Sequence, residues 1–231
     1  MSITEIIKNT ALSLGASEVG FSRLCTCAAG FPGLDNAVTV AVRLSSAVVS
    51  GIADAPTHTY FHHYRTVNAF IDSVCLKIGM TIESEGLLYA CVPASQTVDR
   101  AAFSGLVSHK AAAVAAGLGT IGKSSLFISD KFGPAVRLGT VLTNAELSDG
   151  YSQNSPRDVC GGCDICMRSC PAMAISGDSF DPAQPEKALV DRRACSEFMK
   201  KEFQLIGRGS VCGICIRSCP KFLAQLRGLT Q

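Results

Sequence analysis

Eight of the twelve cysteines of this 231-residue chain fall between residues 160 and 219, and their spacing is the strongest constraint in the sequence. They form two runs, Cys160-x2-Cys163-x2-Cys166-x3-Cys170-Pro171 and Cys195 followed by Cys212-x2-Cys215-x3-Cys219-Pro220. A chain of this length without an export signal is not expected to be a disulfide scaffold, and clustered thiols inside the cell are usually metal ligands. Structural zinc takes its ligands in two separated pairs, whereas this repeated pattern is typical of iron–sulfur proteins. We therefore predict two 4Fe–4S clusters.

The same spacing occurs in bacterial ferredoxins, where it determines which cysteines share a cluster. Three thiolates of one run bind one cluster, and the fourth, just before the proline, binds the other. The first cluster is thus assigned to Cys160, Cys163, Cys166 and Cys219. The second is assigned to Cys195, Cys212, Cys215 and Cys170, with Cys195 in place of the usual first cysteine of its run. The two clusters are predicted to be interleaved.

Four further cysteines stand outside these runs. Cys75 and Cys91 lie in apolar segments and are predicted to be small core residues. Cys25 and Cys27 form a C-x-C pair, for which a metal or redox role remains open.

The composition suits a compact protein and gives no reason to expect a membrane or nucleic acid as partner. Hydrophobic residues make up 47% and charged residues 17% of the chain, and the net charge is +2. The N-terminus reads MSITEIIK, without the apolar core of a signal peptide, and no apolar stretch approaches the roughly 18 residues of a membrane span. We expect a cytoplasmic protein.

Apolar periodicity predicts both helices and strands before the cysteine runs. Helical spacing is found over residues 3–14, 60–84 and 108–116, and strand-like runs over 18–24, 37–44, 87–92, 125–129 and 135–143. Residues 148–158 (SDGYSQNSPRD) are polar and rich in turn formers. We therefore predict an α+β fold, with an α/β cofactor- and substrate-binding domain over 1–150 and a cluster domain over 151–231.

Residues 117–124 (GLGTIGKS) match both the dinucleotide-binding and the P-loop glycine patterns. Both patterns need a strand before the loop and a helix after it, so that the helix N-terminus faces the phosphates. Here an alanine-rich helix precedes the glycines and a strand-like run follows. The glycines are therefore expected to let the backbone approach another flat or bulky ligand.

Three blocks of sequence resemble the epoxyqueuosine reductase family, which is related to the corrinoid reductive dehalogenases. They are SHKAAAVAAGLGTIGKSSLFIS (108–129), FGPAVRLGTVLTN (132–144) and the cysteine runs with DRRACSEF (191–198) between them. The resemblance implies a nitroreductase-like α/β domain that holds cobalamin against a bacterial two-cluster ferredoxin-like module. Electrons would pass through the clusters to cobalt, and the reduced cobalt would act on substrate.

In that family the glycine-rich loop and the strands after it help to form the corrin pocket, so the resemblance also implies cofactor-binding residues. These are Ser108, His109, Lys110, Gly117, Gly119, Gly122, Lys123, Arg137, Gly139 and Thr140. Lys110 and Lys123 are suited to the amides or anionic groups of a corrin, and an ordinary exposed lysine is the open alternative for Lys123. Arg137 lies in an otherwise apolar strand and should have a partner.

Two departures from the family weigh against epoxyqueuosine in tRNA as the substrate. The position of the family's catalytic Asp, counted back from the shared AGLG, falls on Phe103, and Asp99 is nearby but out of register. The long C-terminal extension of many members is absent from this chain, which stops at Gln231. We expect another, smaller substrate.

A reductive cleavage at cobalt needs a proton donor, and His109, Tyr64 and Asp99 are the candidates. A structural, hydrogen-bonded role for His109 is an open alternative. His58, His62 and His63 form a small group, which is either a solvated helix start or a source of a metal or cobalt ligand.

Three functions remain open at this point. The chain is a cobalamin-dependent iron–sulfur reductase, an electron-transfer or activator protein that reduces a corrinoid or flavin held by a partner protein, or a flavin-linked reductase that holds FMN. In each case a small reducing protein such as a ferredoxin or flavodoxin is the expected electron donor.

Overall fold

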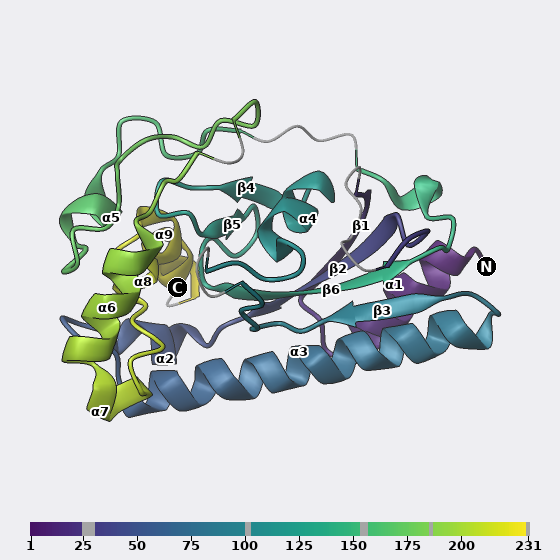
Figure 1. The fold of residues 1–231 in the computed structure, drawn as a ribbon, viewed down its shortest axis with the longest axis horizontal. Coiled ribbons are helices and arrows are strands. Elements are labelled where there is room, and N and C mark those ends of the chain that lie inside the picture. The colour runs from purple at the N-terminus through teal and green to yellow at the C-terminus, as the bar shows by residue number, and fades with distance from the viewer. Residues whose placement is uncertain (25–30, 100–102, 153–156, 185–186, 230–231) are drawn as a thin grey trace. The chain divides into compact units, whose positions relative to one another are not determined.

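The computed structural model describes residues 1–24, 31–99, 103–152, 157–184 and 187–229, so the Cys25 and Cys27 pair lies outside the described residues (Figure 1). The helices are α1 (Ile3–Ser13), α2 (Ser46–Ser50), α3 (His58–Ser84), α4 (His109–Ala115), α5 (Ile165–Arg168), α6 (Arg192–Glu202), α7 (Gln204–Gly207), α8 (Ile214–Arg217) and α9 (Pro220–Leu229), with a short 3-10 turn, η1 (Ser148–Gly150). The strands are β1 (Glu18–Arg23), β2 (Asn36–Arg43), β3 (Tyr89–Val92), β4 (Gly119–Ile121), β5 (Phe127–Ser129) and β6 (Val136–Thr143).

The chain divides into two compact units. Unit 1 contains residues Met1–Arg43, Val67–Gly119 and Arg137–Ser155, and unit 2 contains Leu44–Thr66, Thr120–Val136 and Pro156–Gln231. The last change of unit falls close to the predicted boundary at residue 150. Unit 2 differs from the predicted cluster domain because it also includes residues 44–66 and 120–136, which the sequence pattern placed in the first domain.

Unit 1 is built on a four-stranded sheet with the strand order β1-β2-β6-β3. β1 pairs antiparallel with β2, with Gly20 opposite Thr39, and β3 pairs antiparallel with β6, with Cys91 opposite Val141. β2 is buried along nearly its whole length, which explains its continuous apolar sequence.

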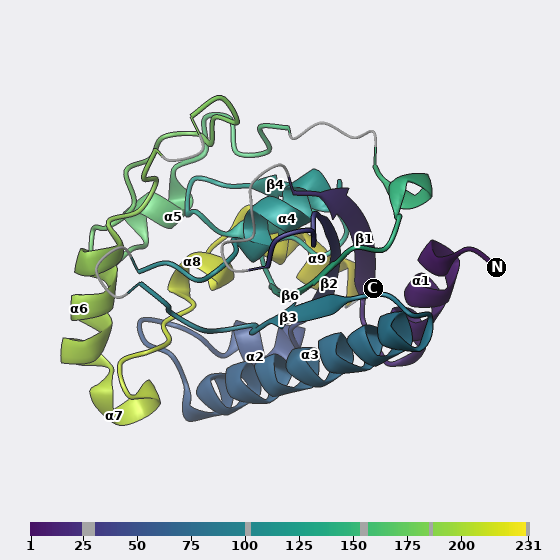
Figure 2. The same cartoon turned by 45° about the vertical axis from the view of Figure 1, so that its right-hand side comes forward.

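Helices cover both faces of this sheet. On one face, Gly139 of β6 leaves room for Ile71 of α3, because a Cβ at Gly139 would lie 2.3 Å from the Ile71 Cγ2 atom. On the other face, Gly20 of β1 leaves room for Ala116, which follows α4, at a corresponding 2.9 Å. The core therefore lies in two layers, one between the sheet and α3 and one between the sheet and α4 (Figures 1 and 2).

Unit 2 contains the two cysteine runs, and each run forms the same short helix. Ile165–Arg168 (α5) and Ile214–Arg217 (α8) carry the sequences ICMR and ICIR, and each is followed by Ser-Cys-Pro. The two helices contact each other. The internal repeat thus brings the two runs together. The β4–β5 pair is a separate two-stranded sheet.

All eight helices and strands predicted before the cysteine runs are present, with ends that differ by a few residues. The sequence analysis did not place α2, β4 or the amphipathic α6. No helix in the described part of the chain is both long enough and apolar enough to cross a membrane.

Candidate functional site

The eight cysteines of the two runs all lie in unit 2, and electrostatic interactions divide them into two sets. Burial raises the pKa of the Cys166 thiol, and Cys160, Cys219 and Cys163 raise it further. Burial likewise raises the pKa of Cys219, with smaller contributions from Cys160 and Cys163. These are the four cysteines predicted for the first cluster.

The other four cysteines interact in the same way. Burial raises the pKa of Cys212 to about 11, and Cys195 and Cys170 add to the increase. Burial also raises the pKa of Cys215, and the nearby Cys212, Cys195 and Cys170 thiols raise it further. Cys166 of the first set makes the smallest contribution to the raised pKa of Cys215. The two sets are neighbours, since α5 and α8 also contact each other.

These thiols are suited to a cationic group that is larger than one ion. Buried thiols with a raised pKa deprotonate only when a cation compensates the thiolate charge. Among the described residues, no three His, Cys, Asp or Glu side chains are grouped to hold a single metal ion. A four-iron cluster keeps its ligand sulfurs apart by its own width, so the two sets fit two such clusters. The assignment of each cysteine to a cluster stays a prediction.

Asp158 fixes the start of the first run, a role that the sequence analysis missed. Its Oδ1 atom accepts hydrogen bonds from the backbone N–H groups of Cys160, at 2.9 Å, and Gly161, at 3.1 Å. Its Oδ2 atom accepts one from the Ser179 hydroxyl at 3.1 Å. These amide hydrogen bonds hold the Asp158 pKa below its usual value. An Asp shortly before a Cys-Gly-Gly turn is the sequence signal for such a motif.

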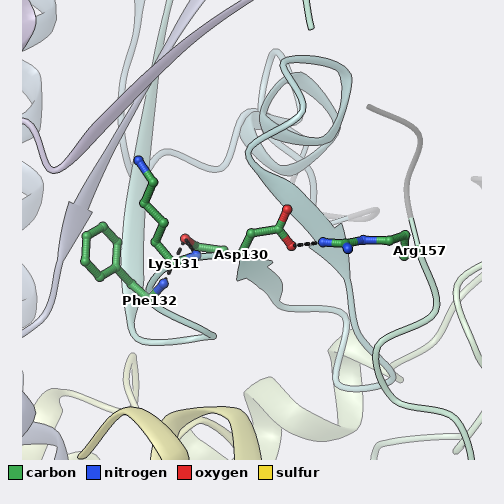
Figure 3. A network of polar contacts seen from close by, with 5 residues as sticks. Asp130, Lys131, Phe132 and Arg157 are labelled. Atoms are coloured by element: carbon green, nitrogen blue, oxygen red, sulfur yellow. Dashed lines mark hydrogen bonds and ion pairs between the residues drawn. The ribbon is translucent and has the colours of Figure 1, made fainter. Parts of the chain in front are cut away.

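The turn that follows β5 makes polar contacts with the segment that carries the cysteine runs (Figure 3). The Ser129 Oγ atom accepts hydrogen bonds from the backbone N–H groups of Lys131 and Phe132, which closes the turn. Asp130 pairs with Arg157, next to Asp158, at 2.9 Å. The Lys131 carbonyl also accepts a hydrogen bond from Gln225 of α9 at 2.5 Å.

The second half of the glycine-rich segment lies beside the first predicted cluster. A Cβ at Gly122 would lie 2.4 Å from the Ile128 Cδ1 atom and 3.3 Å from the Cys160 sulfur. Lys123 contributes, after the hydrogen bonds, to the lowered pKa of Asp158. The order of elements is the one expected from the sequence, with α4 before the glycines and β5 after them, so no helix N-terminus follows the loop as phosphate binding requires.

His109 begins α4, and both of its ring nitrogens contact protein groups. Nδ1 lies 2.8 Å from the buried Thr140 hydroxyl, and Nε2 lies 3.0 Å from the Pro93 carbonyl oxygen. A carbonyl only accepts hydrogen bonds, so Nε2 carries the hydrogen and Nδ1 accepts from Thr140. Burial is the main cause of a lowered pKa for His109, opposed by the Pro93 carbonyl. The ring is therefore neutral and held in one tautomer.

The predicted pocket residues on β6 face opposite sides of the sheet. Gly139 faces α3, and Arg137 donates a hydrogen bond from Nε to the Asn68 Oδ1 atom of α3 at 2.9 Å, which supplies the expected partner. Because strand side chains alternate, Thr140 faces α4, where it contacts His109. The sheet thus separates Arg137 and Gly139 from Thr140, and packing against α3 accounts for Gly139.

The remaining predicted residues have diverse environments. Ser108 is the N-cap of α4 and accepts from the Ala111 N–H at 3.2 Å, and Gly117 has a φ of 68° just after that helix. Lys110 is half-buried, and Gly119 begins β4. Tyr64 belongs to unit 2, and His109 and Asp99 belong to unit 1.

Phe103 occupies a constrained turn. The backbone groups of Asp99 and Ser104 exchange two hydrogen bonds of 3.1 Å across it, and Phe103 has a φ of 50°, which is uncommon outside glycine. Asp99 itself is exposed. Phe103 is half-buried, and it is the position at which the sequence resemblance implies a catalytic Asp.

The histidine group at the start of α3 includes one residue with a clear structural contact. The His63 Nε2 atom accepts a hydrogen bond from the backbone N–H of Ser45, the N-cap of α2, at 3.0 Å. Burial, and then His62, lower the pKa of His63. His58 and His62 are exposed, which fits the helix-start interpretation.

Cys75 is a core residue, as predicted, and is 1% exposed. Cys91 is half-buried, and burial followed by Asp72 raises its pKa to about 11. The Asp72 carboxylate accepts a hydrogen bond from the Ala94 N–H at 2.9 Å. A thiol with a raised pKa is a poor nucleophile, so neither cysteine is suited to covalent chemistry.

Comparison with known families identifies the cluster segment. Residues 159–221 match the 4Fe-4S double cluster binding domain, a range that includes all eight cysteines of the two runs.

Relatives of known activity match part of the chain. A tetrachloroethene reductive dehalogenase of Desulfitobacterium hafniense is 36% identical over 115 residues, which are 46% of this chain and 21% of the dehalogenase. An epoxyqueuosine reductase of Synechococcus sp. (strain RCC307) is 33% identical over 138 residues, which are 57% of this chain and 36% of the reductase. The matches thus span between about a fifth and about a third of the relatives' length.

Solved structures of both kinds share the fold. A catabolic reductive dehalogenase in complex with 3-bromo-4-hydroxybenzoic acid matches with a TM-score of 0.70 at 19% identity, over 96% of this chain and 33% of its own. The epoxyqueuosine reductase from Streptococcus thermophilus matches with a TM-score of 0.62 at 22% identity, over 96% of this chain and 67% of its own. The chain therefore contains a 4Fe-4S double cluster binding domain and is similar, over part of its length, to epoxyqueuosine reductases and reductive dehalogenases.

Proposed function

We propose that this protein is an iron–sulfur oxidoreductase that passes electrons through two 4Fe–4S clusters to a cobalamin centre for a reductive reaction. The carrying observation is the match of residues 159–221, which include all eight cysteines of the two runs, to the 4Fe-4S double cluster binding domain. Bound clusters would supply one-electron storage. The protein's own contribution is to hold the thiolates in place, through Asp158 at Cys160 and through α6 at Cys195.

The corrinoid part of the proposal rests on the relatives and on the start of α4. One solved relative is described as a reductive dehalogenase with a mechanism for B12-dependent dehalogenation. Here the residues that would hold a corrin are Ser108, His109, Lys110 and Gly117, because their polar or backbone groups lie around α4 and not in the α3 core layer. Cobalamin would supply a strongly reducing cobalt centre.

The proposed role of His109 is to position these groups. Its two ring nitrogens are engaged by Thr140 and Pro93, so it has no free hydrogen for a substrate in this arrangement. Tyr64 and Asp99 remain the candidate proton donors, since a phenol and a carboxylic acid can both donate. Phe103 has no ionisable group, which supports a small-molecule substrate other than epoxyqueuosine in tRNA.

A second function is an electron-transfer activator that reduces a corrinoid held by a partner protein. Phe103 favours it, because an activator needs no proton donor at that position. Anaerobic purification, addition of hydroxocobalamin and visible spectroscopy separate the two functions. A cobalamin spectrum in a one-to-one ratio with protein supports the reductase, and clusters without bound corrin support the activator. A bound flavin spectrum would favour a flavin-linked reductase, and a preparation that takes up no iron would contradict every form of the proposal.

A further inference from the structure

The C-terminal part of unit 2 has a net positive charge, whereas the rest of the chain has a net negative charge. Residues 191–231 contain eight Lys or Arg and three Asp or Glu, a net charge of +5, whereas residues 1–190 carry −3, which gives the total of +2. Five exposed cations lie on α6 and directly after α7, and we refer to them as the basic face: Arg192, Arg193, Lys200, Lys201 and Arg208. Lys201 also pairs with Glu202 at 3.2 Å.

The basic face belongs to the same helix as a predicted ligand of the second cluster. Cys195 lies in α6, two residues after Arg193, and burial followed by Cys170 raises its pKa. Helical geometry puts Arg193 and Lys200 on one side of α6 and Cys195 on the opposite side. A molecule that bound to this side would be separated from the second cluster by about one helix diameter, near 10 Å.

Two exposed apolar side chains flank the basic face. Met173 is 89% exposed and Leu205 is 94% exposed. The carbonyl of Ala174, next to Met173, accepts a hydrogen bond from the N–H of Asp191, the N-cap of α6, at 2.8 Å. Met173 thus lies at the start of α6, only three residues after the predicted ligand Cys170.

Leu205 lies in α7, which follows the other end of α6. The chain after α7 packs closely against that end, since a Cβ at Gly209 would lie 2.5 Å from the Lys200 Cα atom. α6 has 11 residues and is therefore about 16 Å long. Met173, Leu205 and the cations between them thus form a small surface, and transient redox complexes have small contact areas.

We propose that the basic face of α6 is the docking surface for an acidic electron-donor protein, which delivers electrons to the second cluster. This inference rests on the proposed function and adds the point of electron entry. Charge complementarity selects the partner, because opposite charges steer encounter and set its rate. In the step itself one electron leaves the donor and one enters an oxidised cluster, and no covalent bond forms or breaks.

The positions of the two cysteine sets then give the electron path between the predicted clusters a direction. The second set contains Cys195 of α6 and is the entry site. The first set contains Cys160, whose sulfur lies next to Gly122 of the glycine-rich segment. Electrons would therefore enter at Cys195 and leave near Gly122.

RNA is the other class of partner that a basic surface could bind. The features of this face favour a protein, because Met173 and Leu205 are suited to an apolar contact, whereas RNA recognition relies on phosphates and on bases stacked on aromatic side chains. The described surface of α6 and α7 offers no exposed aromatic residue for stacking.

The test compares charge reversal on the basic face with the same reversal elsewhere. Arg193→Glu/Lys200→Glu and the control Lys8→Glu/Lys77→Glu change the net charge equally, and the control residues are exposed on α1 and α3. The cluster-loaded protein is mixed with reduced flavodoxin, an acidic donor, and cluster reduction is followed by stopped-flow absorbance. At low salt we expect the first variant to react at least about tenfold more slowly than wild type, and the control to stay within about twofold. Added salt should slow the wild type towards the variant.

Chemical reduction separates failure of this inference from failure of the proposed function. Dithionite needs no docking surface, so it should reduce all three proteins alike. If dithionite reduces them but flavodoxin reacts equally with wild type and Arg193→Glu/Lys200→Glu, the docking surface is wrong and the clusters stand. An equal loss in both double variants would also overturn it, because only net charge would then matter. The docking surface would also be wrong if Arg193→Glu/Lys200→Glu lost binding to a tRNA stem-loop while its reduction by flavodoxin stayed unchanged. A protein that takes up no iron contradicts the proposed function itself.

Discussion

At the scale of single residues, His109 shows how hydrogen bonds determine what a titratable group can do. The sequence allowed it to be a proton donor or a structural residue. The Pro93 carbonyl fixes the hydrogen on Nε2, and the buried Thr140 hydroxyl occupies Nδ1. No sequence pattern predicts these partners, because Pro93 and Thr140 come from distant parts of the chain. The structural interpretation follows from the fold and not from the motif.

The lowered pKa of His109 predicts a pH dependence of stability. Burial holds its pKa in the folded protein below the ordinary value of about 6.5, so the unfolded chain takes up the proton first as the pH falls. Its contribution to stability is therefore complete above about pH 6.5 and is lost as the pH falls towards the folded-state pKa. We expect His109→Ala to lower the free energy of unfolding by about 1–3 kcal/mol near neutral pH, and by less near about pH 5.5. Urea unfolding at both pH values measures this. His58→Ala, at an exposed histidine, is the control and should show neither effect. An equal loss at both pH values would contradict the assignment.

At the scale of elements, most of unit 1 could be predicted and much of unit 2 could not. β2 and β6 are buried apolar runs, and α3 repeats its apolar residues at helical spacing, so local pattern determines them. α6 has a polar sequence without buried residues, so no apolar pattern predicts it. The Asp191 N-cap marks where the helix begins, and Cys195 is its predicted cluster ligand. The alternation of Arg137, Gly139 and Thr140 across β6 was visible in the sequence. The two faces it separates became clear only with α3 and α4 in place.

The N-cap of α6 offers a test of how a helix positions a cluster ligand. The Asp191 Oδ1 atom accepts a hydrogen bond from the Ala194 N–H at 2.9 Å, one residue before Cys195. Asp191→Ala should lower stability by about 0.5–2 kcal/mol, and it should lower the iron content because the first turn of α6 carries the ligand. Ser2→Ala removes the N-cap of α1, which is far from the cysteines in sequence, and serves as the matched control. We expect a similar loss of stability there with the iron content unchanged. If the two variants lost iron equally, the effect would come from general instability.

At the scale of the whole molecule, the order of cysteines along the chain differs from their predicted grouping. Cys170 closes the first run and Cys219 closes the second, yet each interacts with cysteines of the opposite run. Cys170 raises the pKa of Cys212 and Cys215, and Cys160 and Cys163 raise that of Cys219. Interleaving of this kind means that each predicted cluster site takes ligands from both runs. It also gives electrons a short path between them.

The interleaved arrangement predicts which cysteine variants resemble each other. Cys219→Ala should remove the first cluster and match Cys163→Ala, although Cys219 lies in the second run. Cys170→Ala should remove the second cluster and match Cys212→Ala. Each variant should retain about half of the wild-type iron. The EPR spectrum of the reduced protein identifies the remaining cluster. The four spectra should therefore form two pairs, and each pair should combine one variant from the first run with one from the second. Cys75→Ala, at a core cysteine outside both sets, should keep the full iron content and the wild-type spectrum. If Cys170→Ala instead matched Cys163→Ala, each run would bind its own cluster. The electron path from α6 towards Gly122 would then have to pass between two independent sites.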